Sequence, residues 1–235
     1  MILFGLVVVA YFLGAIPFGL IIARSQGVDI RAHGSGNIGA TNVYRVMGKS
    51  WGLLTFFLDA LKGFIPAYFF AQWSGSHESM GVYCGLIAII GHSFPIFLRF
   101  KGGKGVATSA GMLLGVAPFA MGVGLISWIL IMLLFRYVSL ASILATLMVA
   151  ITVWIRNVQP VLTQCLITLL SLLIVWLHRA NIERLFKGTE NRFGKKGSAK
   201  CRFACLVMGA GERLWQWCLI VMDMMSWSGV LSQSK

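Results

Sequence analysis

The feature that most constrains this chain is a succession of long apolar segments separated by short polar connections. A helix that crosses a bilayer needs about 20 predominantly apolar residues. Six segments approach this length: Ile2–Ala23, Trp51–Gln72, Met80–Leu98, Ala117–Phe135, Val138–Ile155 and Pro160–Leu177. A seventh apolar piece, Gly105–Val116, is shorter than these and is followed by Pro118. The pattern predicts an all-α integral membrane protein.

The composition excludes an ordinary soluble enzyme. Only 11% of the residues are charged and 58% are hydrophobic, whereas soluble domains carry about 25% charged residues. The net charge of +13 fits a membrane protein whose cytoplasmic loops collect Lys and Arg. It also suits anionic lipid headgroups and phosphorylated substrates. We expect no nucleic-acid partner, because no basic stretch alternates with aromatic residues on a soluble face.

The cysteines do not indicate a metal site. They stand at positions 84, 165, 201, 205 and 218, without a C-x-x-C pair or a neighbouring histidine cluster. Structural zinc and disulfide frameworks both need closer groupings. We therefore expect no metal, no cofactor and no disulfide framework.

The charges of the connecting loops predict the topology. Four basic residues follow the first apolar segment, none lies in the connection 73–79, and Arg99, Lys101 and Lys104 follow the third. The basic stretch Arg179–Arg202 follows the last. An external N-terminus and a cytoplasmic C-terminus then require an odd number of crossings. We predict seven transmembrane helices, with Gly105–Val116 as a short one, in a single membrane domain of residues 1–198.

The first polar segment is Gly34–Lys49. Its glycines, amides and hydroxyls cannot form an apolar span, but they can form a compact loop whose donors face a ligand. A cytoplasmic turn with a helix cap is the alternative interpretation. The candidate ligand-binding residues are Ser35, Gly36, Asn37, Thr41, Asn42 and Arg45, the last offering a guanidinium fork for phosphate.

The second polar segment is FKGGKGVATSAG, residues 100–111. Gly102, Gly103 and Gly105 allow positive φ values that could turn several N–H groups toward one oxyanion. Lys104 adds positive charge, and a helix beginning at Val106 adds a positive end. The alternative is a glycine-rich turn whose lysines only mark the cytoplasmic side. The spacing is not that of a Walker loop.

The third polar segment is HRANIERLFKGTE, residues 178–190. His178 and Asn181 are three residues apart, so they share one helix face and could reach the site where the loops meet. An interfacial helix with snorkelling basic residues is the alternative. We expect Glu190 to be structural, paired with a basic residue of the first two segments. All three polar segments fall on the cytoplasmic side of the seven-helix topology, which favours one shared site.

Charged residues inside the apolar segments have a simpler interpretation. Asp59 and Lys62 are spaced for a local ion pair, and we expect that pair to be structural. His92, near the end of the third span, is more typical of a buried hydrogen-bonded histidine than of a catalyst.

The chain resembles a known family at this point. The motifs SGNIGATNVYR, GHSFPIFLRFKGGKGVAT and HRANIERLFKGTE, with RYVSLAS at 136–142, are similar to those of bacterial membrane glycerol-3-phosphate acyltransferases that use acyl phosphate as donor. The resemblance covers residues 1–198. It implies transfer of a fatty acyl group to the 1-hydroxyl of sn-glycerol 3-phosphate, which gives lysophosphatidic acid and phosphate in the first step of phospholipid synthesis. It also implies a bacterial cytoplasmic membrane and an active site facing the cytoplasm.

The resemblance assigns roles to residues. It implies catalytic roles for Ser35, Arg45, Lys104, His178 and Asn181. It links the loop glycines and Ser142 to substrate binding, and it implies a structural role for Glu190. No histidine is followed by Asp five residues later, so the H-x-x-x-x-D acyltransferase motif is absent. We infer that positioning and charge neutralisation carry the catalysis, with the donor phosphate accepting the hydroxyl proton.

Two other function classes stay open from the residues alone. A phosphate or organic-anion transporter would also use glycine loops, but its site would lie near the midplane between repeats. A scaffold for acidic lipid would leave the Asn, Ser and Thr groups without a purpose. We take a monomer as the working expectation. The tail, residues 199–235, lies outside the resemblance and is expected to form an interfacial helix rather than an extra span.

Overall fold

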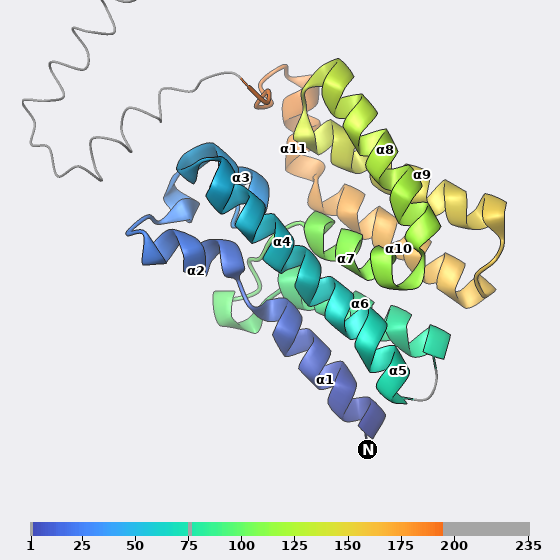
Figure 1. The fold of residues 1–235 in the computed structure, drawn as a ribbon. Helices are drawn as coiled ribbons and strands as arrows, with labels where there is room; N and C mark the ends of the chain where they lie inside the picture. Colours follow the sequence, from blue (N-terminus) through green and yellow to red (C-terminus); the bar gives the residue numbers. More distant parts are fainter. Residues whose placement is uncertain (1, 75–76, 195–235) are drawn as a thin grey trace, which may run out of the picture. The chain divides into compact units, whose positions relative to one another are not determined.

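The computed structural model describes residues 2–74 and 77–194, and that part of the chain contains helices and loops but no strands. The tail expected at 199–235 lies outside the described residues. Short loops join most of the helices, as expected for a membrane bundle (Figure 1). In chain order the elements are α1 Ile2–Ala15, α2 Phe18–Ser25, η1 Ile30–Ala32, α3 Ala40–Met47, α4 Lys49–Ile65, η2 Pro66–Phe70, α5 Ala71–Ser74, α6 His77–Ser93, η3 Ile96–Leu98, α7 Val106–Val116, α8 Pro118–Phe135, α9 Val138–Arg156, α10 Val161–Leu177 and α11 Arg179–Phe186.

The predicted membrane class agrees with the helix lengths. Five described helical stretches are long and apolar enough to span a bilayer, or six if the pair α10 and α11, bent by 54°, forms one span. The helix α7 is shorter, with 11 residues. Only 11% of the span Pro118–Phe135 is buried, against 56% of Met80–Leu98. Helix α8 therefore lies at the edge of the bundle, whereas α6 lies in its core.

The first span is broken between α1 and α2. Pro17 has no backbone N–H to donate to the carbonyl of Leu13, so the helical hydrogen-bond ladder is interrupted here. The carbonyl of Ile16, in this break, accepts from the N–H of Phe18 at 3.1 Å. Lys62 Nζ donates to that carbonyl at 2.7 Å and lies 2.8 Å from Asp59 Oδ1. The predicted Asp59–Lys62 pair is thus confirmed, and it also ties α4 to the break in the first span.

Glycines let the central helices approach closely. A Cβ added at Gly63 on α4 would lie closer than 3.0 Å to the carbonyl oxygen of Thr108 on α7, and one added at Gly111 would overlap that of Ala60 in the same way. Small residues at such crossings allow backbone contact that larger side chains would prevent. Helix α7 is therefore held directly against α4.

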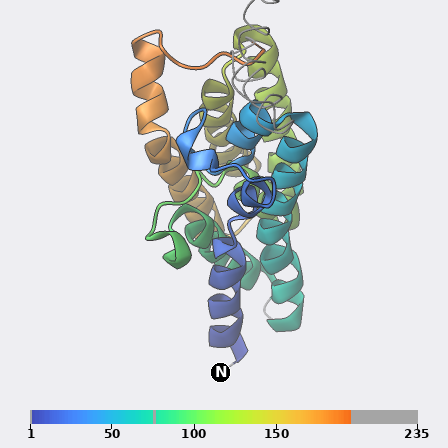
Figure 2. The ribbon, with the colours of Figure 1, turned by 90° about the vertical axis from the view of Figure 1, so that its left-hand side faces the viewer.

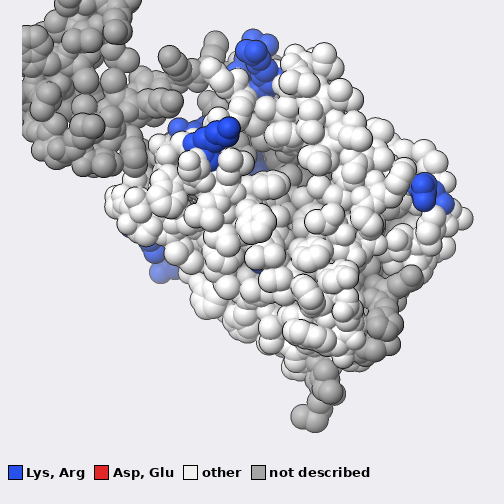
Figure 3. Space-filling model, in the orientation of Figure 1, with Lys and Arg blue, Asp and Glu red and all other residues white. Residues whose placement is uncertain are grey.

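The two ends of the bundle differ. In both ribbon views the N-terminus lies at the bottom, whereas α3 and α11 lie toward the top (Figures 1 and 2). Basic side chains form separate groups, the more prominent toward the upper part of the surface, and a wide face is almost free of charge (Figure 3). An uncharged face of this width suits contact with lipid tails.

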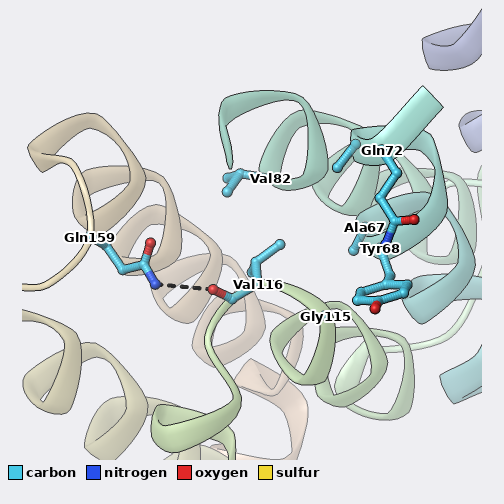
Figure 4. A pocket seen from close by; sticks show the side chains of 8 residues that line it. Ala67, Tyr68, Gln72, Val82, Gly115, Val116 and Gln159 are labelled. Atoms are coloured by element: carbon cyan, nitrogen blue, oxygen red, sulfur yellow. Dashed lines mark hydrogen bonds between the residues drawn. The ribbon is translucent and has the colours of Figure 1, made fainter. Parts of the chain in front are cut away.

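A cavity of about 330 Å³ lies at the C-terminal end of α7. Its lining includes the side chains of Tyr68, Gln72 and Gln159 (Figure 4). Gln159 Nε2 donates to the carbonyl of Val116 at 3.0 Å, which satisfies an oxygen that the end of α7 leaves free. The cavity marks where the short helix stops before the end of the bundle.

The contact between α4 and α7 can be tested with Gly111→Ala. The added methyl meets backbone atoms, which no side-chain rotation can relieve, so we expect a loss of about 1–3 kcal/mol or more, as for overpacked cores. The matched control is Gly122→Ala in α8, where a Cβ meets nothing within 4 Å. Thermal unfolding in detergent should show a lower midpoint for Gly111→Ala only. Equal midpoints for both variants would contradict the close contact.

Candidate active site

The first polar segment is organised around Asn42. Its side chain is 1% exposed, and its Oδ1 accepts a hydrogen bond from the backbone N–H of Ser35 at 2.7 Å. Its Nδ2 donates to the carbonyls of Ile30 at 3.1 Å and His33 at 3.0 Å. Both protons of the amide are thus used inside the loop. Asn42 shapes the loop that carries Ser35, and its amide does not face outward to a ligand.

The other residues of this segment lie nearer the surface. Asn37 Oδ1 accepts a hydrogen bond from the backbone N–H of Gly39 at 2.8 Å. Gly39 is the N-cap residue of α3. Gly36 has a φ of 69°, a backbone conformation that favours glycine. The side chain of Ser35 is exposed and that of Thr41 is half-buried. Ser35 and Thr41 therefore remain accessible to a ligand, while Asn37 helps to begin α3.

The glycine-lysine loop differs from the expected anion nest. Of its three glycines at 102, 103 and 105, only Gly105 has a positive φ, of 77°. The N–H groups of Gly102 and Gly103 donate to the carbonyls of Ser93 and His92, each at 3.1 Å. The expectation that these two amides converge on a ligand is wrong, because α6 uses both. Glycine is required at 102 and 103 for close contact with the end of that helix, since a Cβ at either would lie closer than 3.0 Å to His92.

The helix that follows the loop still offers free donors. Helix α7 begins at Val106 as predicted, with Gly105 as its N-cap residue. Its first helical bond runs from Ser109 N–H to the Gly105 carbonyl at 2.7 Å. The N–H groups of Val106, Ala107 and Thr108 precede that bond and have no acceptor within the helix. The positive helix end therefore lies directly after Lys104.

Glu190 is the centre of the third polar segment. The carboxylate accepts from Ser139 Oγ at 2.8 Å, Asn181 Nδ2 at 2.7 Å and Arg184 Nε at 2.7 Å. Burial acts to raise the pKa of Glu190, but these hydrogen bonds and the Arg184 charge lower it overall. The expected direct pairing with a basic residue of the first two segments is wrong: Arg184 comes from the third segment itself. Ser139 and Arg184 were not among the predicted site residues.

Lys104 joins the second and third segments. Its Nζ donates to Oδ1 of Asn181, so Asn181 bridges Lys104 and Glu190. Burial lowers the pKa of Lys104 to about 8; Glu190 opposes the shift, and Arg184 and Arg45 reinforce it. A half-buried ammonium under the influence of two guanidinium groups suits an anion.

Arg45 brings the first segment to the same cluster. Burial lowers the pKa of its guanidinium, Glu190 raises it and Arg184 lowers it, so these charges lie close enough to interact. The ring of Tyr44, next to Arg45, packs against Phe193 with centroids 5.0 Å apart. The chain just beyond the third segment therefore reaches back to α3.

His178 lies at the bend between α10 and α11. It is 3% exposed, and Nδ1 lies 2.8 Å from the carbonyl of Ile174. A carbonyl oxygen only accepts, so Nδ1 carries the proton and neutral His178 presents Nε2 as its acceptor. The charges of Lys104 and Glu190 both act on the imidazole, which places it beside the cluster.

Ser142 lies one helical turn beyond Ser139. Its hydroxyl donates to the carbonyl of Val138 at 2.8 Å and accepts from Trp128 Nε1 at 3.2 Å. The structure thus brings together Arg45, Lys104, His178, Asn181 and Glu190, while Ser35 and Ser142 make their hydrogen bonds elsewhere. Among the described residues, no three His, Cys, Asp or Glu side chains gather as a metal site.

The chain is similar to known proteins over most of its length. The family model described as glycerol-3-phosphate acyltransferase matches residues 4–188. The glycerol-3-phosphate acyltransferase of Aquifex aeolicus is 46% identical over 188 residues, which cover 80% of this chain and 97% of that protein. That of Geobacter sulfurreducens is 47% identical over 188 residues, covering 80% and 96%.

Solved structures of a relative match the fold as well. The crystal structure of PlsY (YgiH), an integral membrane glycerol 3-phosphate acyltransferase, in its glycerol 3-phosphate form has a TM-score of 0.78 and 45% identity, covering 82% of this chain and 96% of that one. Its lysophosphatidic acid form has a TM-score of 0.76. Fold, site and matches define a membrane-embedded acyltransferase. The chain belongs to the glycerol-3-phosphate acyltransferase family.

Glu190→Gln tests whether the carboxylate holds the cluster together. Loss of hydrogen bonds to a charged group costs about 1.5–3 kcal/mol, so we expect a clearly lower unfolding midpoint. The control is Glu183→Gln, because Glu183 forms an exposed pair with Lys187, and such pairs contribute about 0–1 kcal/mol.

The pH dependence of that difference follows from the lowered pKa of Glu190. The carboxylate stabilises the fold above the ordinary Glu pKa of 4.5, and this contribution is lost as the pH falls through the lowered value. The midpoints of parent and Glu190→Gln should therefore converge in acid. A constant gap between them at all pH values would contradict the role of the charge.

Proposed function

We propose that this protein transfers a fatty acyl group from acyl phosphate to the 1-hydroxyl of sn-glycerol 3-phosphate. The products are lysophosphatidic acid and inorganic phosphate. The observation that carries the proposal is the cluster of Arg45, Lys104 and Arg184 around the single carboxylate of Glu190. Family membership supports it, as do the glycerol 3-phosphate and lysophosphatidic acid forms of the related enzyme.

The charges of the cluster suit phosphorylated substrates. Three cations face one carboxylate, which leaves positive charge for a phosphate dianion. Lys104 donates to Asn181, and a phosphate oxygen can replace that amide oxygen as the acceptor. The free N–H groups at the start of α7 adjoin Lys104 and offer further donors. One phosphate among these groups would neutralise them without any movement of the helices.

The chemical step needs positioning more than a strong base. The hydroxyl oxygen attacks the acyl carbon, the bond from that carbon to the phosphate oxygen breaks, and the hydroxyl proton passes to the departing phosphate. Arg45 neutralises the charge that develops on the departing phosphate, while Lys104 holds the phosphate of glycerol 3-phosphate. His178 presents one acceptor, Nε2, and can orient the attacking hydroxyl. Ser35 and Asn181 supply neutral hydrogen bonds, and Ser142 supports the α9 side of the site.

The membrane topology belongs to the same proposal. Seven crossings, with α7 as the short one, leave the N-terminus outside, and the three polar segments and the C-terminus facing the cytoplasm of a bacterial cell. Helix α7 has 11 residues and so rises about 16 Å, which is roughly half the hydrocarbon thickness of about 30 Å. Its loop therefore lies recessed, where an acyl chain in the bilayer and a soluble glycerol phosphate can meet. Arg156, which this topology places outside, lies over the Phe119 ring at 4.2 Å.

Reconstitution with three donors in parallel tests the function. We expect phosphate release and lysophosphatidic acid formation with acyl phosphate, only when glycerol 3-phosphate is present. Acyl-CoA and acyl carrier protein should not replace it, because the site offers anion-binding groups and no thioester-binding apparatus. Uptake of phosphate or an organic anion into vesicles without acyl transfer would instead favour the transporter alternative.

The pKa of Lys104 predicts the pH dependence of substrate binding. Its folded-state pKa is about 8, so the ammonium is present below that pH and is lost above it. The value of kcat/KM for glycerol 3-phosphate, which reports the free enzyme, should fall as the pH rises through about 8. In Lys104→Arg the charge persists to high pH, so this fall should disappear even if the rate is lower. An unchanged alkaline limb in Lys104→Arg would exclude Lys104 as its source.

His178→Gln and His178→Ala separate orientation from proton transfer. Glutamine can offer a hydrogen-bond acceptor but is no base near neutral pH. If His178 only orients the hydroxyl, Gln should keep activity roughly tenfold or more above Ala, since general base catalysis would contribute about 10²–10⁴. Equal loss in both variants, with a parent pH profile that shows a pKa near neutrality, would favour a general base.

A further inference from the structure

Three buried ionisable groups lie outside the proposed reaction. Asp59 and Lys62 on α4 are each 2% exposed, and His92 on α6 is 6% exposed. Charged groups within a membrane domain are costly to keep and need partners. Their cost suggests that they make structural contacts that apolar side chains could not make.

The three groups form a connected line from the first span to α6. Lys62 Nζ donates to the carbonyl of Ile16 at 2.7 Å, which also accepts from Phe18 N–H, and lies 2.8 Å from Asp59 Oδ1. The same Oδ1 lies 3.7 Å from His92 Nδ1, close enough for a charge interaction but too far for a hydrogen bond. The ring of Phe18 lies 5.6 Å from Lys62 Nζ on the other side. His92 is thus the member of the network that faces away from the broken span.

His92 carries the glycine-lysine loop on its other side. The backbone N–H of Gly103 donates to the His92 carbonyl, and a Cβ at Gly103 would overlap His92 Nε2. The loop backbone therefore rests directly on the imidazole ring. Lys104, whose Nζ reaches Asn181, is the next residue. A shift of the ring would move Gly103 and, with it, the ammonium of Lys104.

Helix α4 also fixes the far end of that loop. Gly63 and Gly111 press α4 and α7 together, and α7 begins two residues after Lys104. The loop is therefore held by His92 at one end and by α7 at the other, and both His92 and α7 lie against α4. These two contacts fix the position of Lys104 in the site.

We propose that His92 is a positioning residue for substrate binding, anchored by Asp59 and Lys62 and acting through Gly103 on Lys104. The inference rests on the proposed function, because the readout is the binding of glycerol 3-phosphate. His92 does not touch the reacting atoms and exchanges no proton in the reaction. Its side chain supports the loop so that the ammonium of Lys104 is in position to bind phosphate.

The main test compares His92→Gln with the parent enzyme. We expect the KM for glycerol 3-phosphate to rise about tenfold while kcat changes less than about threefold, since a misplaced binding group weakens positioning. Gly103→Ala, which inserts a methyl group against the same ring, should give the same split. The double variant His92→Ala, Gly103→Ala should be no worse than the poorer single variant, because both act on one contact.

Gly85→Ala is the matched control for general packing damage. A Cβ at Gly85 on α6 would overlap the side chain of Met112 on α7, so it disturbs the same pair of helices away from the loop. We expect a lower unfolding midpoint without a change in KM. A rise in KM equal to that of His92→Gln would overturn the inference.

A second variant covers the case in which His92 substitutions do not fold. Asp59→Asn together with Lys62→Met removes both charges at once, which avoids an unpaired buried charge. We expect a folded enzyme with a raised KM for glycerol 3-phosphate, because His92 has lost its anchor. If the parent turns over acyl phosphate while these variants keep its KM, the inference fails but the function stands. No turnover by the parent would reject the function itself.

Discussion

Each backbone polar group that loses its helical partner in an apolar medium must find another, at a cost of several kcal/mol if it does not. Pro17 cannot donate to the carbonyl of Leu13, and in the break that it causes the carbonyl of Ile16 accepts from the N–H of Phe18 and from Lys62 Nζ. The lysine then needs a counter-ion, which Asp59 provides, and that carboxylate faces His92. The interrupted helix is thus linked to a buried ion pair, and that pair lies beside the histidine that supports the loop carrying Lys104.

At the active-site end the unbalanced groups are cations. Arg45, Lys104 and Arg184 lie around the carboxylate of Glu190. That carboxylate already accepts hydrogen bonds from Ser139, Asn181 and Arg184. Without substrate, Lys104 is left with a neutral amide oxygen as its hydrogen-bond partner. Burial lowers the pKa of Lys104, Glu190 opposes that shift, and Arg184 and Arg45 add to it. A bound phosphate, as proposed, would supply the negative charge that these cations lack.

The sequence predicts the membrane class, the span boundaries to within a few residues and the helix that begins at Val106, because these depend on hydropathy and local signals. It does not predict what the glycines do. Gly102 and Gly103 are typical of an anion-binding turn, yet their N–H groups bind the end of α6. A choice between ligand and helix as the acceptor depends on tertiary packing that no local pattern contains. For the same reason Arg184 and Ser139 were missed: an arginine on an amphipathic helix and a serine in an apolar one carry no signal until Glu190 folds back between them.

The short α7 connects these two levels of the structure. Because Gly63 and Gly111 hold it against α4, its position along the bundle is set by backbone contact and not by its own hydrophobic length. An 11-residue helix rises about 16 Å, roughly half the hydrocarbon thickness of about 30 Å, and a cavity lies at its C-terminal end (Figure 4). In the proposed topology the loop at its N-terminal end is recessed, so a phosphate bound there would lie below the headgroup level while the acyl chain stays in hydrocarbon. The proposed arrangement would let a water-soluble acceptor and a lipid-soluble donor react without either one leaving its own medium completely.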